Sequence, residues 1–202
     1  MKDRMSKIGL YFGSFNPIHI GHIVIAGYMT EFTPIEEIWF VVSPQNPLKK
    51  KGSLLDNYQR LHMVNLGIGR NYRMKASDIE FRLPLPSYTI HTLAYLEEKY
   101  QNHNFCLVMG EDNLHTLDKW KNAAELVKRY EIYVYPRPGS GKPHSPALDT
   151  LMSRAAVRHV RAPLMDISGT FIRKGIRQGK DMSYFMPAAV WKYIDEMGFY
   201  RK

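Results

Sequence analysis

Apolar residues occur along this chain in two arrangements, as short continuous runs and as longer stretches with an apolar residue every three or four positions. The runs are typical of buried strands and the longer spacing of amphipathic helices. The sequence predicts strands at 8–12, 38–43, 105–109, 131–135 and 157–160. It predicts helices at 19–31, 57–67, 87–100, 114–128 and 170–178, and a last helix that begins at Pro187. A loop rich in Pro and Gly is predicted at 136–146.

Strands and helices that alternate in this way predict a parallel sheet with helices on both faces. The expected fold is therefore α/β, a Rossmann-like doubly wound sheet with a small helical part at its C-terminal end. We expect one domain over residues 1–202, with the helical portion from about residue 166 to 202. Ligands of such sheets bind beyond the carboxyl ends of the strands, so residues that follow strands are the first candidates for a site.

Composition narrows the class of protein. The chain has 202 residues, 45% of them hydrophobic and 23% charged, which fits a globular protein with a sizeable core. Its one cysteine, Cys106, lies in an apolar run and is expected to be a packed thiol in a reducing compartment. The polar start of the chain shows no secretory pattern, and the apolar stretch 23–29 is too short to cross a bilayer. We expect a cytoplasmic protein with no membrane partner.

The formal net charge of +9 favours an anionic partner, such as a nucleic acid, a membrane surface or a phosphorylated small molecule. The only dense basic run is 49–51, which a solvated loop also explains. A protein that binds nucleic acid would need a continuous basic stripe with aromatic residues between the charges. The other Lys and Arg residues are scattered, so nucleic-acid binding is kept as an alternative of another class.

The first predicted strand runs into residues 13–22, Gly-Ser-Phe-Asn-Pro-Ile-His-Ile-Gly-His. Gly13 permits a sharp turn, and Gly21 would let a ligand approach the helix that follows. The N-terminus of that helix offers unpaired N–H groups, and His19 and His22 lie on the same side of its first turn. These features suit a phosphate group. The histidines could instead be turn or capping residues, or metal ligands, for which His-x-x-His alone is a weak signal.

A second candidate for a phosphate site is residues 167–173, Ile-Ser-Gly-Thr-Phe-Ile-Arg, which precede a predicted helix. Ser168 or Thr170 can cap that helix. Arg173 follows Thr170 by one turn, so a guanidinium, hydroxyls and backbone N–H groups can converge on one anion. Taken alone, the segment is also compatible with a plain helix start and a surface arginine.

Together the two segments resemble the nucleotidyltransferase superfamily with the His-x-Gly-His motif, which is similar to class I aminoacyl-tRNA synthetases in its ATP-binding core. The second segment matches that superfamily's Ile-Ser-x-Thr-x-Ile-Arg pattern. The resemblance implies that His19, His22 and Arg173 are catalytic, contacting the phosphates of ATP and stabilising the transition state. It implies an ATP-binding set of Gly13, Ser14, Phe15, Gly21, Lys49, Gly110, Asp112, Ile167, Ser168 and Thr170.

Three further segments resemble bacterial nicotinate-nucleotide adenylyltransferases: Ser-Tyr-Thr-Ile-His-Thr-Leu at 87–93, Met-Gly-Glu-Asp-Asn-Leu at 109–114 followed by Trp120, and the ending from 185 to 200. Two smaller pieces agree, Pro-Leu-Lys at 47–49 and Arg60 with Met63, so the resemblance covers about residues 8–200. It implies transfer of AMP from ATP to nicotinate mononucleotide in NAD biosynthesis. The products would be nicotinate adenine dinucleotide and pyrophosphate, with Mg²⁺ bound to ATP and no metal ligands from the protein.

The same resemblance implies a mononucleotide-binding set of Ser87, Tyr88, Thr89 and Trp120. Trp120 would stack on the cationic pyridinium ring, although it could also be a core aromatic. Backbone N–H groups of the helix that opens at 87–89 would favour the carboxylate of the acid over the amide by about tenfold or more. Nicotinamide mononucleotide and phosphopantetheine are alternative acceptors, and a homo-oligomer is left open.

Four positions depart from the family pattern: Phe12, Asn16, Glu111 and Gly169. Asn16 replaces an aspartate, which argues against a metal at that position. Two roles stay open at this stage. Asp112 could accept hydrogen bonds from a ribose or base, or cap the helix that follows, and Arg137 could reach a phosphate or be solvated.

Overall fold

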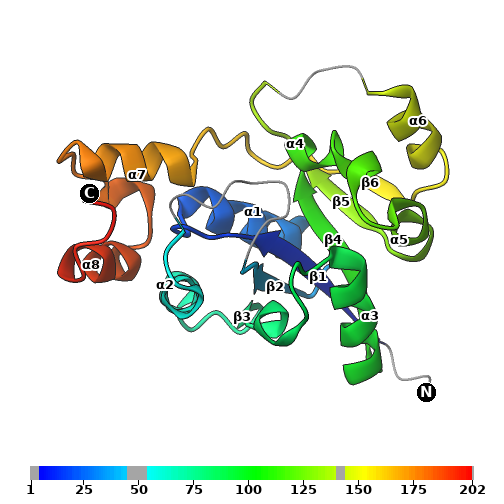
Figure 1. Ribbon diagram of the computed structural model, residues 1–202, viewed down its shortest axis with the longest axis horizontal. Helices are drawn as coiled ribbons and strands as arrows, with labels where there is room; N and C mark the ends of the chain where they lie inside the picture. Colours follow the sequence, from blue (N-terminus) through cyan, green and yellow to red (C-terminus); the bar gives the residue numbers. More distant parts are fainter. Residues whose placement is uncertain (1–4, 45–53, 140–143, 202) are drawn as a thin grey trace.

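The computed structural model describes residues 5–44, 54–139 and 144–201 and contains a six-stranded parallel sheet (Figure 1). The order across the sheet is β3-β2-β1-β4-β5-β6. The strands are β1 (Ser6–Gly13), β2 (Glu37–Val42), β3 (Met74–Ser77), β4 (His103–Gly110), β5 (Ile132–Tyr135) and β6 (Val157–His159). From β1 the chain first adds strands on one side of the sheet (β2, β3) and then on the other side (β4, β5, β6). This is the doubly wound arrangement, and it confirms the predicted fold class.

Helices connect the strands and extend beyond the last one. The α-helices are α1 (Ile20–Phe32), α2 (Asn57–Ile68), α3 (Thr89–Lys99), α4 (Glu111–Leu114), α5 (Ala123–Arg129), α6 (Pro146–Met152), α7 (Gly169–Arg177) and α8 (Ala188–Glu196). Three short 3₁₀ helices are η1 (Ile79–Arg82), η2 (Leu117–Lys119) and η3 (Ser183–Phe185). In Figure 1 the C-terminal helices α7 and α8 lie together at one end of the molecule, close to α2.

The predicted helix over 114–128 is wrong, because the segment is broken into α4, η2 and α5. Asn122 adopts a left-handed conformation, with φ of 52°, and no α-helix can continue through such a residue. The short strand β3 and the helix α6 were not predicted. β3 has four residues at the edge of the sheet, and α6 buries only Leu148, so neither leaves a strong apolar pattern.

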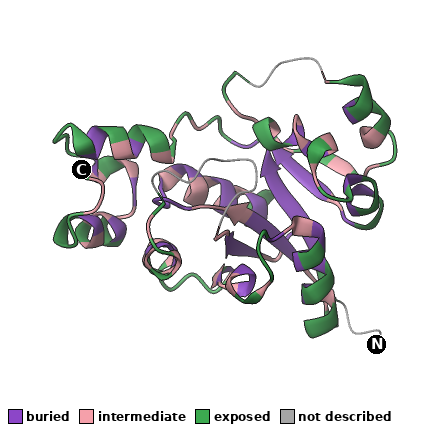
Figure 2. Cartoon of the chain, in the orientation of Figure 1, coloured by how far each residue is buried: buried purple, intermediate pink, exposed green. Residues whose placement is uncertain are grey.

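Alternate residues of the strands fill two separate cores, one on each face of the sheet. One core packs Phe40, Val42 and Val108 against α1, α2, α7 and α8. The other packs Trp39 and Val41 against α3, α5 and α6. Figure 2 shows the central strands as the most buried part of the molecule, with helices exposed on their outer sides. Two-sided burial explains why the strands appear in the sequence as continuous apolar runs.

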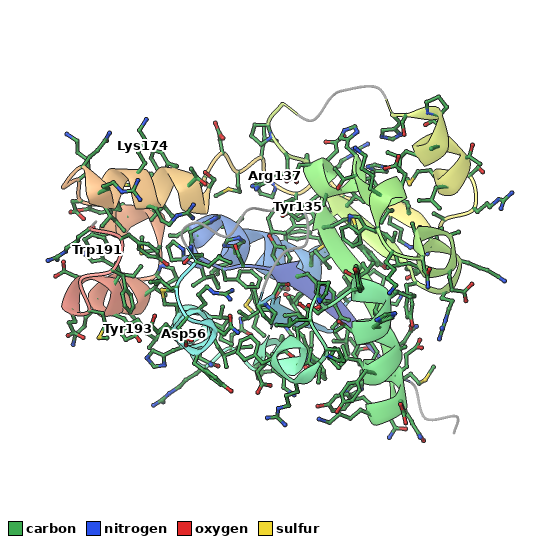
Figure 3. All side chains as sticks on the ribbon, in the orientation of Figure 1. Asp56, Tyr135, Arg137, Lys174, Trp191 and Tyr193 are labelled. Carbon is green, nitrogen blue, oxygen red and sulfur yellow. The ribbon has the colours of Figure 1, made fainter. Side chains whose placement is uncertain are left out.

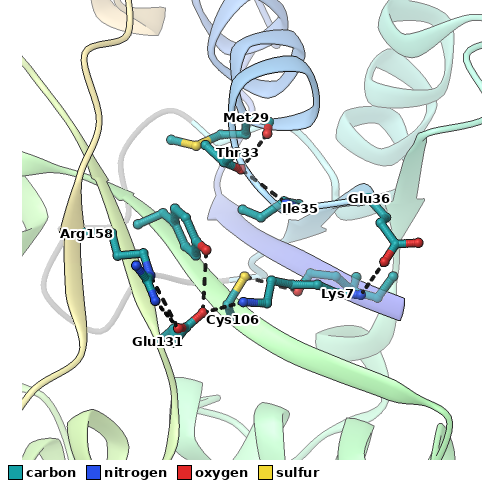
Figure 4. Close-up of polar contacts among 10 residues, drawn as sticks. Lys7, Met29, Thr33, Ile35, Glu36, Cys106, Glu131 and Arg158 are labelled. Carbon is teal, nitrogen blue, oxygen red and sulfur yellow. Dashed lines mark hydrogen bonds and ion pairs between the residues drawn. The ribbon is translucent and has the colours of Figure 1, made fainter. Parts of the chain in front are cut away.

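Two ion pairs of Glu131, the residue before β5, connect it to Lys7 of β1 and Arg158 of β6 (Figure 4). Glu131 accepts from Lys7 at 2.6 Å and from Arg158 at 2.9 Å, and the hydrogen bond from Lys7 lowers the pKa of this carboxyl. Cys106 is buried beside it and donates to the carbonyl of Ile8, which confirms the packed thiol. Burial raises the pKa of the Cys106 thiol to about 12, so the group is not a nucleophile at neutral pH.

In the ranges that the structure describes, no helix combines the length and the apolar composition needed to cross a membrane.

Candidate active site

A cleft of about 550 Å³ opens at the carboxyl ends of β1 and β4, where the order of the sheet reverses. Both predicted phosphate segments contribute to its lining, and so do the residues predicted to bind a mononucleotide. The predicted residues that line it are Gly13, Ser14, Phe15, His19, His22, Ser87, Tyr88, Thr89, Asp112, Trp120, Ser168, Thr170 and Arg173. The structure therefore brings into one cavity residues that are up to 160 positions apart, from Gly13 to Arg173.

The two loop-to-helix junctions meet directly at one side of the cleft. Arg173 Nη1 donates to the main-chain carbonyl of Asn16 at 2.7 Å. A Cβ at Gly169 would lie 2.9 Å from that same carbonyl oxygen and 3.1 Å from Arg173 Nη1. The glycine that departs from the family pattern thus lets the start of α7 approach the loop after β1. The two segments predicted to bind phosphate are therefore in direct contact.

The start of α7 is arranged to offer donors to the cleft. Ser168 caps the helix, because its Oγ accepts from the N–H of Phe171 at 3.2 Å. Thr170 Oγ1 accepts from Arg173 Nη2 at 3.2 Å and so fixes the direction of the guanidinium. Ser168 and Thr170 are exposed and line the cleft, whereas Ile167 does not line it and packs against the core. The predicted ATP-binding role of Ile167 stays a prediction.

His19 and His22 form a stacked pair, with ring centroids 3.7 Å apart and planes inclined by 26°. His22 Nδ1 accepts from the backbone N–H of His19 at 3.2 Å, which leaves the proton of a neutral ring on Nε2. Burial, helped by the charge of Arg137, lowers the pKa of His19 to about 3. Burial, with His19 and Arg137 next in importance, also lowers the pKa of His22. Both rings are neutral at pH 7 and can act as hydrogen-bond donors, while Arg173 carries the fixed positive charge.

Each of the two glycines of the first segment leaves space for a neighbouring side chain. The left-handed residue of the turn is Phe15, with φ of 44°, and not Gly13. A Cβ at Gly13 would lie 2.8 Å from the Phe15 ring, so this glycine makes room for the phenyl group. Gly21 does not line the cleft. Its missing Cβ leaves space for the His19 ring, whose Nδ1 would be 3.1 Å from that atom.

Replacing Gly21 with alanine should lower kcat by about tenfold or more, because the added methyl group displaces the His19 ring from its place beside His22. Steady-state kinetics with saturating ATP measures the effect. The matched control is Gly27→Ala in the same helix, where an added Cβ meets no atom within 4 Å. That variant should keep full activity and gain about 0.5–1 kcal/mol of stability. Equal activity in the two variants would contradict this role of Gly21.

The half of the cleft predicted to bind the mononucleotide is lined by aromatic side chains, Tyr88 and Trp120, and by hydroxyl side chains, Ser87 and Thr89. α3 begins at Thr89, with Tyr88 as its N-cap residue, so its free N–H groups lie at the cleft as predicted. Trp120 lines the cleft, and its half-buried ring also packs against the core. Ser87 Oγ is buried and lines the cleft.

Arg137 joins the cleft from the end of β5, beside Tyr135 (Figure 3). Its Nε lies 3.6 Å from Asp112 Oδ1, so Asp112 pairs with a cation and does not cap α4, whose N-cap residue is Gly110. Gly110 does not line the cleft, and a side chain there would collide with the Asp112 carboxylate. Lys49, the remaining predicted ligand of ATP, lies outside the described residues.

Arg60 holds together backbone segments next to the cleft, a role that the sequence does not reveal. The side chain is fully buried and donates to the carbonyls of Ser14 at 2.6 Å, Ser43 at 2.9 Å and Leu55 at 3.0 Å. It also donates to Asn57 Oδ1 at 2.6 Å. Burial lowers its pKa from the usual arginine value, and the four hydrogen bonds hold the loop after β1, the end of β2 and the start of α2 together.

Asn16 lies in the same framework, because its Oδ1 accepts from the backbone N–H of Leu55 at 3.3 Å and from the Tyr200 hydroxyl at 2.6 Å. Its carboxamide is buried and engaged with the protein. This position therefore has a structural use in the chain.

Glu80 is a second residue that sequence reasoning missed. Its side chain is buried at the edge of the cleft, and Oε1 accepts from the Thr92 hydroxyl at 2.9 Å. Burial raises the pKa of the carboxyl, while the hydroxyls of Thr92, Ser43 and Ser87 oppose the rise. A single glutamate in the short helix η1 has no motif of its own, so only its location identifies it.

Comparison with known proteins finds a matching family model and similar sequences. The family model described as cytidylyltransferase-like matches residues 10–175. A protein of Christiangramia forsetii named probable nicotinate-nucleotide adenylyltransferase is 50% identical over 195 residues, which cover 96% of this chain and 98% of that protein. A protein of Flavobacterium johnsoniae with the same name is 51% identical, with 97% of this chain and 100% of the relative covered.

A solved structure is similar in fold: Plasmodium falciparum nicotinic acid mononucleotide adenylyltransferase complexed with NaAD. It superimposes with a TM-score of 0.80 at 20% identity, and the match covers 97% of this chain and 98% of that one. At this identity the likeness shows the fold alone.

Proposed function

The chain belongs to the nicotinate-nucleotide adenylyltransferases of the cytidylyltransferase-like family, and from this membership we propose that it transfers AMP from ATP to nicotinate mononucleotide. The products are nicotinate adenine dinucleotide and pyrophosphate, in NAD biosynthesis. The observation that carries the proposal is the direct contact between the two phosphate segments, Arg173 to the carbonyl of Asn16, beside the stacked histidines. A single triphosphate can be held between them.

The reaction is an in-line displacement. An oxygen of the mononucleotide phosphate forms a bond to the α-phosphorus of ATP, the bond from that phosphorus to the bridging oxygen breaks, and pyrophosphate leaves with the electron pair. A phosphate oxyanion needs no activation by a protein base. The contribution of the protein is therefore alignment of the two reactants and stabilisation of the charge that develops on the phosphoryl oxygens.

Each group in the phosphate half has a part in this step. Arg173 supplies a positive charge whose direction Thr170 fixes. The Nε2–H of His22 would donate a hydrogen bond to a phosphoryl oxygen from a half-buried neutral ring, a setting in which such a bond is stronger than in water. The free N–H groups at the starts of α1 and α7 add the partial positive charge of a helix N-terminus.

We propose that Mg²⁺ enters with ATP. The groups at the phosphate half are mostly hydrogen-bond donors, namely Arg173, Thr170, Ser168 and the imidazoles, which suit phosphate oxygens. Within the described residues, no cluster of three or more His, Cys, Asp or Glu side chains could hold an ion. Mg²⁺ commonly retains several waters and is bound through substrate phosphates, where it neutralises charge. This fits an ion held by the triphosphate.

The decisive experiment offers each acceptor separately. Purified protein is incubated with ATP and Mg²⁺ and with nicotinate mononucleotide, nicotinamide mononucleotide or phosphopantetheine, and pyrophosphate release is measured. We expect the fastest release with nicotinate mononucleotide. Faster release with another acceptor would reassign the substrate. If no acceptor gave pyrophosphate and the protein bound an oligonucleotide with steep salt dependence, the nucleic-acid alternative would replace the proposal.

Trp120→Ala should raise the KM for nicotinate mononucleotide by about tenfold and change the KM for ATP little. The variant removes a stacking surface for the pyridinium ring, a contact of about 0.5–2 kcal/mol plus the buried area of the indole. Trp191→Ala on α8 is the matched control, since Trp191 is half-buried away from the cleft. Equal KM values for the mononucleotide in the two variants would contradict stacking by Trp120.

We also propose that the enzyme acts in the cytoplasm, a reducing compartment that suits the free thiol of Cys106.

A further inference from the structure

We propose that Lys121 selects the carboxylate form of the mononucleotide over the uncharged amide, by presenting an ammonium group to the aromatic half of the cleft. The inference rests on the proposed function and names the side chain that determines specificity within it. Lys121 follows Trp120 directly and lines the cleft together with Tyr88 and Trp120.

The position of the ammonium group is defined by the aromatic ring beneath it. Lys121 Nζ lies 4.4 Å from the centroid of the Tyr88 ring, a cation–π contact. Within the described residues, no carboxylate lies within ion-pair distance of Lys121. An ammonium held over a ring without a carboxylate partner can pair with an anion that enters the cleft.

Two further features of this half point to the same kind of group. Tyr88 is the N-cap residue of α3, so the free N–H groups of that helix lie at the cleft. Ser87 Oγ is buried, lines the cleft, and lies beside the Glu80 carboxyl. A hydroxyl donor, a helix N-terminus and an ammonium group in the same half of the cleft favour an oxygen-rich anion as the occupant.

The carboxyl of Glu80 increases the need for the positive charge of Lys121 in this half of the cleft. Its buried carboxyl lies at the edge of the same half, close enough to Ser87 for that hydroxyl to influence its pKa. A second carboxylate that enters from the substrate would be repelled by any negative charge on Glu80. A nicotinamide ring carries no such charge and would not need compensation. The charge of Lys121 is therefore expected to act on the acid and to leave the amide unaffected.

The test compares kcat/KM for nicotinate mononucleotide and nicotinamide mononucleotide in Lys121→Met, which keeps the apolar stem and removes the charge. We expect kcat/KM for the acid to fall about tenfold and that for the amide to stay within about twofold. Lys121→Arg, which restores a cation, should recover most of the preference. Raising the salt concentration should reduce the acid preference of the wild type and leave that of Lys121→Met unchanged.

Lys128→Met is the matched control, because Lys128 is an exposed lysine of α5 that lies outside the cleft. It should keep the wild-type ratio. An unchanged acid-to-amide ratio in Lys121→Met, with wild-type protein active, would overturn the inference and leave the proposed function intact. Absence of pyrophosphate release from wild type with either nucleotide would instead reject the proposed function.

Discussion

Replacing His22 with alanine is expected to lower kcat by roughly 10²–10³-fold while the KM for nicotinate mononucleotide changes by less than about threefold. In the proposed mechanism the imidazole, whose Nδ1 is occupied by the N–H of His19, donates from Nε2 to a phosphoryl oxygen, and this bond would strengthen as charge develops in the transition state. Because burial keeps the ring neutral, the loss is that of a well-placed donor and not of a charge. Steady-state kinetics with each substrate varied in turn separates the two constants.

Two variants make this test specific. His22→Gln retains an N–H donor on a side chain of similar reach and should recover part of kcat. His159→Ala removes an exposed histidine of β6, outside the cleft, and should behave as wild type. A kcat for His22→Ala equal to that of wild type would exclude the imidazole from the mechanism.

The largest expected effect on stability is at Arg60. Arg60→Met should lower the free energy of unfolding by about 3–5 kcal/mol, which for a chain of this size corresponds to roughly 6–20 °C in Tm. The methionine fills much of the space, but the carbonyls of Ser14, Ser43 and Leu55 lose their donor in a buried setting. Denaturant titration followed by circular dichroism measures the change.

Arg60→Lys provides a second reading if the methionine variant does not fold. It keeps the charge and one donor group and should lose less stability than Arg60→Met. The control is Arg70→Met at an exposed position just beyond α2, where the change should be within about 0.5 kcal/mol. A stable Arg60→Met protein would show that the guanidinium does not hold the loops together.

The sequence could predict those parts of the fold that depend on local patterns. Strands buried on both faces give unbroken apolar runs, and the predicted strands at 8–12 and 105–109 match β1 and β4. The break at Asn122 could not be predicted, because the conformation of one residue interrupts a pattern whose apolar spacing continues on both sides. β3 has only four residues, too few to show a period.

The candidate site divides in the same way. Residues that act through their own chemistry, such as His22 and Arg173, lie in motifs and were predicted. Residues that act through where the chain places them were not. Glu80 and Arg60 gain their importance from burial, which depends on packing between distant segments, and Lys121 from its contact with the Tyr88 ring. The glycines show a further limit, since a motif indicates that no side chain fits but not which neighbour requires the space.

The loop after β1 is fastened by partners from the far end of the chain: Arg173 lies 157 positions after Asn16, and Tyr200 lies 184 positions after it. Contacts of such long sequence separation form only after much of the chain has been ordered, because closing a long loop costs conformational entropy that other contacts must offset. A ribosome-bound chain that has already exposed its histidine motif would therefore still be unable to hold a nucleotide there. The phosphate site is therefore complete only when α7 and the C-terminal residues have packed against the loop after β1.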